Sequence, residues 1–386
     1  MTGEDQPKKK KRGLLRNAFS IAFFSLLAYI VISLISGNGL GFDWLPGLFS
    51  TGESVELSDE FHFNIGRSRV FADLDNALAA SGSLGIQVLD YAGSETLRDS
   101  FQMNAPAISS DNGRAIAFDI GGTAARVFDA NEIIASITTG GPIISASINR
   151  SGWFTISAQE GGGYRGIVSV YNSSGSMVYR VSLSSGYVLS AQLSPDNRSL
   201  AVLNLTDGGS RITFYHGLDK DYADAAFDLP GGLIVDAQYL SNGDMLAVTA
   251  DSLITIDAGR GSGAEIFGFS GMRLGGYAIS GDFIALHLLD FGIGHRGRLL
   301  TLDSFGNLFG EVMIERELIS MSLRDGHISA MFSDGLFIYD RSLKEIPLSD
   351  ESPSAAGVSR VLILNGGATL VAGDRFAVVA GIGAHP

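Results

Sequence analysis

The chain has 386 residues, of which 45% are apolar, and this is enough to bury a sizeable core. Glycine is abundant with 50 residues while proline is scarce with nine, which excludes a proline-rich linker and suits an ordered fold with many tight turns. Cysteine is absent, so disulfides, zinc–thiolate sites and cysteine nucleophiles are excluded. Residues 1–17 carry a charge of +4 and the remainder −18, and so acidic a domain repels nucleic acid.

The first predicted element is an apolar stretch over residues 18–36, which contains no charged side chain. As a helix it would extend roughly 28 Å, about the thickness of the hydrocarbon layer of a membrane. A cleavable signal peptide has a shorter apolar region that ends at an A-x-A-like site, whereas this one ends in Ser36-Gly37-Asn38-Gly39. We therefore expect an uncleaved transmembrane helix, with cleavage as the alternative.

Basic residues precede this helix and predict its orientation. Lys8, Lys9, Lys10, Lys11, Arg12 and Arg16 should stay inside, because positive charge concentrates on the cytoplasmic side of a membrane. The expected organisation is a basic cytoplasmic tail (1–17), a transmembrane helix (18–36), an extracytoplasmic tether (37–57) and an extracytoplasmic domain (58–386). The chain is thus predicted to be a single-pass protein of the cell membrane.

Beyond the tether, two patterns repeat in phase at intervals of about forty residues, and such periods indicate a repeat architecture. In the first pattern, a β-rich run ends in an apolar residue followed by Asp or a substitute: Leu89-Asp90, Phe128-Asp129, Tyr171-Asn172, Tyr215-His216, Ile256-Asp257, Leu302-Asp303, Tyr339-Asp340 and Val379-Ala380. The second marks a tight turn between strands: Asp75-Asn76, Asn112-Gly113, Ser151-Gly152, Asp196-Asn197, Asn242-Gly243, Gly281-Asp282, Asp325-Gly326 and Asn365-Gly366.

Each repeat is interpreted as four strands. In the third repeat these are residues 143–149, 153–159, 166–171 and 177–183. Four-stranded units repeated without intervening helices are typical of a β-propeller, so an all-β propeller is the predicted fold. The last repeat, 357–379, has room for three strands, and residues 60–65 form a spare strand that would close the ring by pairing with it. Eight blades are favoured and seven are the alternative.

These repeats resemble the WD40-like and quinoprotein-like propeller superfamily over residues 58–386. With its predicted anchor the chain also resembles single-pass propeller proteins of Gram-positive bacteria. It departs from both groups of propellers, because it lacks the Gly-His and Trp-Asp dipeptides of WD40 blades and has only Trp44 and Trp153 in place of quinoprotein Trp repeats. The resemblance therefore implies the fold more strongly than an activity.

No motif for catalysis, a metal or a cofactor stands out. The six histidines form no H-x-H, H-x-x-H or H-E-x-x-H pair, and His216 is interpreted as a turn residue. Asp219, Asp221 and Asp224 resemble the opening of a calcium loop, but the Gly and terminal Glu of such a loop are missing, so a solvated acidic loop is favoured. The prediction is a non-enzymatic protein without a cofactor.

Four loops between second and third strands share a glycine-rich sequence that begins with an acid and ends with arginine. Equivalent loops of a propeller emerge on one face, so these arginines are expected around one rim, where guanidinium groups could bind an anionic ligand. The plainer interpretation is that each arginine pairs with the acid of its own hairpin. The loops begin at Asp119, Glu160, Asp207 and Asp290, and the arginines are Arg126, Arg165, Arg211, Arg296 and Arg298.

Two classes of function follow. The first is a binding or scaffolding module at the outer face of the membrane, with a wall polymer, a peptide or another envelope protein as partner. The alternative is a propeller-type polysaccharide lyase or hydrolase, whose carboxylates would converge at the central channel from several blades. A deep channel lined by two or more carboxylates within about 10 Å of each other would favour the enzyme, and one lined by Ser, Gly and apolar residues would favour binding.

Overall fold

The computed structural model describes residues 59–159, 164–292, 294–348, 352–374 and 376–381. The chain separates into two compact units, Met1–Val55 and Glu56–Pro386, and all described residues belong to the second unit. The tail, transmembrane helix and tether predicted over residues 1–57 lie outside the described residues. Among the residues that are described, no helix has the length and apolar character needed to cross a membrane.

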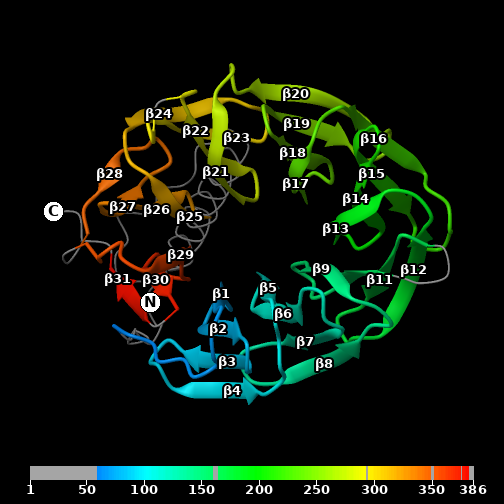
Figure 1. Ribbon diagram of the computed structural model, residues 1–386, viewed down its shortest axis with the longest axis horizontal. Coiled ribbons are helices and arrows are strands. Elements are labelled where there is room, and N and C mark those ends of the chain that lie inside the picture. Colours follow the sequence, from blue (N-terminus) through cyan, green and yellow to red (C-terminus); the bar gives the residue numbers. More distant parts are fainter. Residues whose placement is uncertain (1–58, 160–163, 293, 349–351, 375, 382–386) are drawn as a thin grey trace, which may run out of the picture. The chain divides into compact units, whose positions relative to one another are not determined.

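The second unit is an eight-bladed β-propeller, as the repeats predicted. Eight antiparallel sheets surround a central axis, and in each sheet consecutive strands are neighbours (Figure 1). Seven sheets have four strands and the eighth has three. The first strand of each blade lies next to the axis and the last lies at the perimeter.

The strand bounds follow the predicted period. Blades 1 to 4 consist of β1 (Val70–Asp73), β2 (Ala77–Gly82), β3 (Gly85–Asp90), β4 (Glu95–Asp99); β5 (Pro106–Asp111), β6 (Arg114–Asp119), β7 (Ala124–Phe128), β8 (Ile133–Thr138); β9 (Ile143–Ile148), β10 (Phe154–Ala158), β11 (Gly166–Tyr171), β12 (Met177–Leu183); β13 (Tyr187–Leu193), β14 (Ser199–Thr206), β15 (Gly209–His216) and β16 (Ala225–Pro230). Blades 5 to 8 consist of β17 (Ile234–Tyr239), β18 (Met245–Thr249), β19 (Ser252–Asp257), β20 (Ser262–Gly268); β21 (Arg273–Ser280), β22 (Phe283–Leu289), β23 (Gly297–Asp303), β24 (Leu308–Ile314); β25 (Leu318–Arg324), β26 (His327–Phe332), β27 (Gly335–Tyr339), β28 (Glu345–Ile346); β29 (Val358–Ile363), β30 (Thr369–Gly373) and β31 (Ala377–Ala380).

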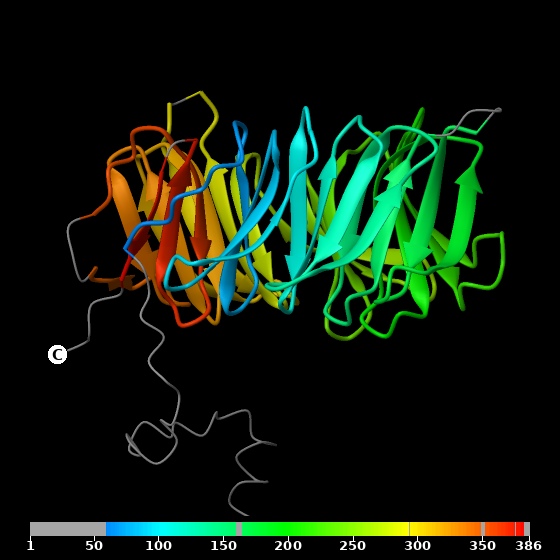
Figure 2. The same cartoon turned by 90° about the horizontal axis from the view of Figure 1, so that it is seen from below.

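All eight predicted tight turns connect the first and second strands of their blades. Left-handed backbone explains their composition, because Asn112 has a φ of 48° and Gly113 a φ of 77°. These turns lie together on one face of the ring, which we name the turn face. The connections between second and third strands lie on the opposite face, which we name the loop face (Figure 2).

The Asp that recurs at the end of the third strand in five of the eight blades also has a local cause. The Asp303 side chain accepts hydrogen bonds from the backbone N–H groups of Phe305 and Asn307, at 2.9 and 2.8 Å. Asp340 makes the same bonds with Ser342 and Lys344, at 2.8 and 3.0 Å. Such Asx turns satisfy backbone donors where the chain reverses into the outer strand, so this repeated acid builds structure rather than a site.

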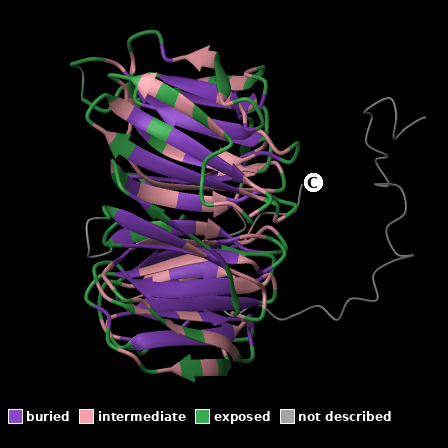
Figure 3. Cartoon of the chain, turned by 90° about the vertical axis from the view of Figure 1, so that its right-hand side faces the viewer, coloured by how far each residue is buried: buried purple, intermediate pink, exposed green. Residues whose placement is uncertain are grey.

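The core lies between the blades. Between blades 1 and 2, Ala79 and Val88 pack against Ala115 and Phe128, and equivalent clusters recur around the ring. Buried residues accordingly fill the interior of the strands, and exposed residues concentrate in the connections (Figure 3). Both neighbouring blades contribute side chains to each cluster, so each blade depends on its neighbours for stability.

The N-terminal segment closes the ring against β31, as the three-stranded last repeat predicted. Glu60 forms an antiparallel bridge with Val378, and the N–H of Phe61 donates to the carbonyl of Ala377 at 2.7 Å. We expected a strand over residues 60–65, but the observed pairing is an isolated bridge at Glu60. Phe61, Phe63 and Ile65 are nevertheless buried, so side-chain packing holds the segment where the hydrogen-bond ladder ends.

Candidate functional site

The structure places all five predicted rim arginines on the loop-face half of a third strand or in the loop just before it. Arg126, Arg211 and Arg298 lie on β7, β15 and β23, while Arg165 and Arg296 directly precede β11 and β23. All five positions therefore lie at the same end of the third strands of their blades. Whether the five together bind an anion stays a prediction.

Among the described residues, four of the five guanidinium groups contact a carboxylate. Arg296 pairs with the acid of its own loop, Asp290, at 3.3 Å. The other three reach acids on outer strands, so the guanidinium groups point toward the perimeter rather than the channel. These exposed or half-exposed pairs contribute about 0 to 1 kcal/mol each. The pairs are Arg126 with Asp99 at 2.8 Å, Arg211 with Asp228 at 2.7 Å, and Arg298 with Glu311 at 2.8 Å.

Glycines in these loops have conformational reasons of their own. A Cβ on Gly122 would lie 2.3 Å from the Asp119 carboxylate. That carboxylate is buried, and it accepts the backbone N–H groups of Asn104 and Ala105. Gly209 has a φ of 128°, and a Cβ there would lie 2.2 Å from the carbonyl of Leu229. The glycine-rich composition therefore follows from backbone geometry and is not by itself evidence of anion binding.

Arg165 differs from the other rim arginines. Its guanidinium donates to the hydroxyl of Tyr187 at 2.7 Å and lies 5.1 Å from the centre of the Tyr187 ring. In the part of the chain that the structure describes, it contacts no carboxylate. Among the described residues, its charge is therefore held in place by an aromatic side chain and not by a carboxylate.

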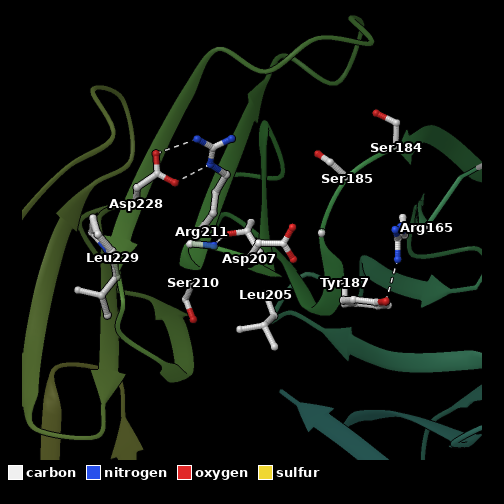
Figure 4. Close-up of a pocket in the computed structure, with 14 residues that line it drawn as sticks. Arg165, Ser184, Ser185, Tyr187, Leu205, Asp207, Ser210, Arg211, Asp228 and Leu229 are labelled. Atoms are coloured by element: carbon white, nitrogen blue, oxygen red, sulfur yellow. Dashed lines mark hydrogen bonds and ion pairs between the residues drawn. The ribbon is translucent and has the colours of Figure 1, made fainter.

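Arg165 and Arg211 both line a groove on the loop face, where blade 3 meets blade 4 (Figure 4). The groove has a volume of about 780 Å³, within the range of small-molecule and peptide sites. Arg165 and Tyr187 lie on one side of it, and Asp207, Arg211 and Asp228 lie on the other. The lining is completed by Ser184, Ser185, Gly186, Leu205, Thr206, Gly208, Ser210, Leu229 and Pro230.

The electrostatics of the two sides differ. Arg211 donates to both carboxylate oxygens of Asp228, at 2.7 and 2.8 Å, and these bonds hold the pKa of Asp228 below its usual value. Among the described residues, no basic side chain pairs with Asp207 in this way, and its carboxylate is directed into the groove in Figure 4. Between Asp207 and Arg165 the surface is apolar and open, since Tyr187 is 58% and Leu205 37% exposed.

The mouth of the central channel on the turn face is a second cavity, of about 720 Å³. First strands of blades 2 to 6 line it, and their side chains are mostly Ser, Gln, Asn and apolar, with Asp111 as the carboxylate among them. Several channel serines have structural roles. The hydroxyl oxygens of Ser320 and Ser322 accept the backbone N–H groups of Val361 and Ile363 in the next blade, at 3.0 and 3.1 Å.

The acidic loop of blade 4 is explained by its own contacts. Asp224 accepts the backbone N–H of His216 at 2.7 Å and pairs with Lys220 at 3.1 Å. Across the described residues, no group of three or more His, Asp or Glu side chains is arranged to hold a metal ion. His216 itself bonds Ser199 through Nδ1 at 2.8 Å, consistent with a turn residue.

Sequence reasoning missed two parts of this picture. Tyr187 and the connection Ser184-Ser185 were hidden, because they follow the outer strand of blade 3 and gave no motif beyond a turn. The contact of Arg324 with Asp73 and Asp75 was hidden because it joins blades 7 and 1.

Comparisons with known proteins agree with the fold. A model of the family of unknown function DUF5711 matches residues 52–345. No curated protein matches the chain. Three solved structures are similar at 11–13% identity, which shows the fold alone. They are the computationally designed Ika8 protein (11% identity, TM-score 0.62, 84% of this chain and 98% of that one), the C-terminal WD40 domain of Sif2 (12%, 0.58, 84% and 100%) and BamB from Moraxella catarrhalis (13%, 0.51, 83% and 99%).

Proposed function

The chain belongs to the DUF5711 family, whose function is unknown, and we propose that its propeller is a non-catalytic binding module held at the outer face of a membrane. Its partner would be an envelope component: a wall polymer, a peptide or a membrane protein. The WD40 and BamB structures among its neighbours support the propeller fold, which is widely used as a binding scaffold.

The observation that carries this proposal is the groove between blades 3 and 4. This groove has a volume of about 780 Å³. Among the described residues, it brings together the exposed ring of Tyr187, the guanidinium of Arg165, which has no carboxylate partner, and the carboxylate of Asp207, which has no basic partner. An apolar surface with a few convergent polar groups is the usual composition of a ligand site. No catalytic role is needed to explain any of these groups.

The alternative, a polysaccharide lyase or hydrolase, needs carboxylates that converge on the channel. At the turn-face mouth, Asp111 is the carboxylate of the lining. Of the two acids near it, Asp73 is mostly buried against Arg324 and Tyr91, and Asp75 pairs with Arg324 at 2.6 Å. Glycoside hydrolysis requires two carboxyl groups about 5 to 9 Å apart that both face the substrate. The lining therefore favours binding over this chemistry.

The proposed orientation rests on the basic residues before Ala18 and on the apolar stretch 18–36. Protease added to intact, wall-stripped cells should remove the domain, because it would lie outside the membrane. A cytoplasmic marker protein of the same cells should survive. A domain that is protected until the membrane is lysed would show the opposite orientation.

The binding role is tested by retention of envelope fractions on the immobilised full-length protein in detergent. Replacing both groove residues, Arg165→Ala and Tyr187→Ala, should abolish retention of the bound component. The matched control is Tyr222→Ala, which removes an equally exposed tyrosine from the turn face of blade 4. Equal retention by all three proteins would show that the groove is not the binding site, and no retention by the unaltered protein would overturn the binding function.

A further inference from the structure

The groove has opposite charges on its two sides. Arg165 enters from the loop before β11 of blade 3, and Asp207 enters from the loop between β14 and β15 of blade 4. In the described part of the chain Arg165 bonds only Tyr187, and no salt bridge joins Asp207 to a basic residue. Arg211, four residues beyond Asp207, is already bound by Asp228 through two hydrogen bonds. Within the described residues, the charges of Arg165 and Asp207 are therefore left without an ionic partner.

The surface between these charges is apolar with hydroxyl groups at its edge. Tyr187 and Leu205 form the open apolar part, and Ser184 and Ser185 are exposed beside them. A ligand that satisfied all of these groups would carry one negative group, one positive group and a hydrocarbon part between them. It would also offer hydrogen-bonding groups to the serine hydroxyls.

A uniformly anionic polymer fits this arrangement poorly. Arg165 and Arg211 are balanced by Asp207 and Asp228, so the lining has no net charge, and the chain beyond residue 17 carries −18. Such a polymer would gain one contact with Arg165 and would be repelled by Asp207 and by the domain as a whole. A peptide segment offers both signs of charge, apolar side chains and amide groups within one short chain.

From this complementarity we propose that the groove binds a short extended peptide segment, with an acidic group on Arg165, a basic group on Asp207 and an apolar side chain on Tyr187 and Leu205. This inference rests on the proposed binding function and specifies the class of its ligand. The groove volume accommodates a few residues of such a segment.

The test uses labelled tetrapeptides and fluorescence anisotropy with the full-length protein in detergent. The panel contains peptides with one Glu and one Lys separated by zero, one or two Leu residues, together with Glu-only and Lys-only peptides. At least one mixed-charge peptide should bind at least tenfold more tightly than either single-charge peptide. Arg165→Gln and Asp207→Asn should each remove about that tenfold advantage.

The single-charge peptides are the internal control, because each variant should change the binding of one of them and should not weaken the binding of the other. Asp207→Asn should leave the Glu-only peptide bound as before or slightly more tightly, while Arg165→Gln should leave the Lys-only peptide unchanged. Arg298→Gln, which alters a paired loop-face arginine outside the groove, should affect no peptide.

Two results would overturn the peptide assignment while leaving the binding function standing. One is tighter binding of polyglutamate or poly(glycerol phosphate) than of every mixed-charge peptide, with a further gain in Asp207→Asn. The other is retention of an envelope fraction that depends on Arg165 and Tyr187 without any measurable binding of the panel. Loss of the binding function itself would appear differently, as no retention of any envelope fraction by the unaltered protein.

Discussion

Closure of the ring by the N-terminal segment can be tested at a single buried side chain, Phe61. The Phe61 side chain is 2% exposed and packs in one cluster with Phe63, Phe71, Leu370 and Ala377. The cluster packs blade 8 against blade 1, so it holds the last and the first blade of the ring together. We expect Phe61→Ala to destabilise the domain by about 3 to 5 kcal/mol, because it removes a buried aromatic ring and leaves a cavity.

The neighbouring residue supplies a matched control. His62 alternates with Phe61 along the same segment, and its side chain is 84% exposed, so His62→Ala should change stability by at most about 0.5 kcal/mol. The main-chain bond from Phe61 to Ala377 is available to both variants. Any difference between them therefore measures side-chain packing at the closure.

Urea unfolding of the full-length protein in detergent, followed by tryptophan and tyrosine fluorescence, measures both variants against the unaltered chain. An unchanged slope with a lower midpoint would indicate a loss of stability in the folded ring. If Phe61→Ala unfolded at the same urea concentration as His62→Ala, the segment would not hold the ring closed and this reasoning would be refuted.

Two further predictions concern buried charge. Arg324→Ala should cost about 3 to 5 kcal/mol in urea unfolding, because it leaves the buried carboxylate of Asp73 without its cationic partner and with the Tyr91 hydroxyl as its hydrogen-bond donor. Arg260→Ala, in an exposed pair, should cost under about 1 kcal/mol, and equal losses would remove any special role for the buried contact. Burial lowers the pKa of His287, which is 1% exposed, to about 4. Since the unfolded chain takes up this proton near its ordinary pKa of about 6.5, His287 leaves the free energy of unfolding undiminished above that pH and lowers it as the pH falls toward 4. Between pH 7 and 4.5, the free energy of unfolding of His287→Leu should therefore fall by about 2 to 3 kcal/mol less than that of the unaltered protein. Identical decreases would show that His287 does not have a lowered pKa in the folded protein.

Local chemistry explains why the fold could be predicted from the sequence. The turn Asn112-Gly113 needs left-handed backbone, and this requirement acts within a few residues, so it leaves a visible dipeptide at each repeat. The Asp that recurs at the ends of third strands acts over the same short range. The single closing bridge was harder to delimit, because burial of Phe63 and Ile65 replaces the strand pairing that the alternating pattern suggested.

Contacts of the site could not be predicted in the same way, because they join different blades. The repeated acid and arginine of each loop suggested pairing within one hairpin, yet Arg126 pairs with Asp99 of the preceding blade. In the same way, Tyr187 meets Arg165 only because blade 4 begins beside the loops of blade 3. A repeat pattern predicts the contacts within each blade, whereas the contacts between blades depend on how the closed ring places them side by side.

The two faces of the propeller differ in what fixes their sequences. Every turn-face connection between first and second strands contains at least one residue with left-handed backbone, so Asn, Asp or Gly recurs there in all eight repeats. Loop-face connections are not so constrained: β14 and β15 are joined by Asp207-Gly208 alone, while β22 and β23 are joined by residues 290–296. Residues that vary between repeats of one chain are free to serve a partner, and at the junction of blades 3 and 4 that freedom leaves an open tyrosine, an arginine and an aspartate around one groove. A binding function for this ring is therefore most reasonably sought on its loop face.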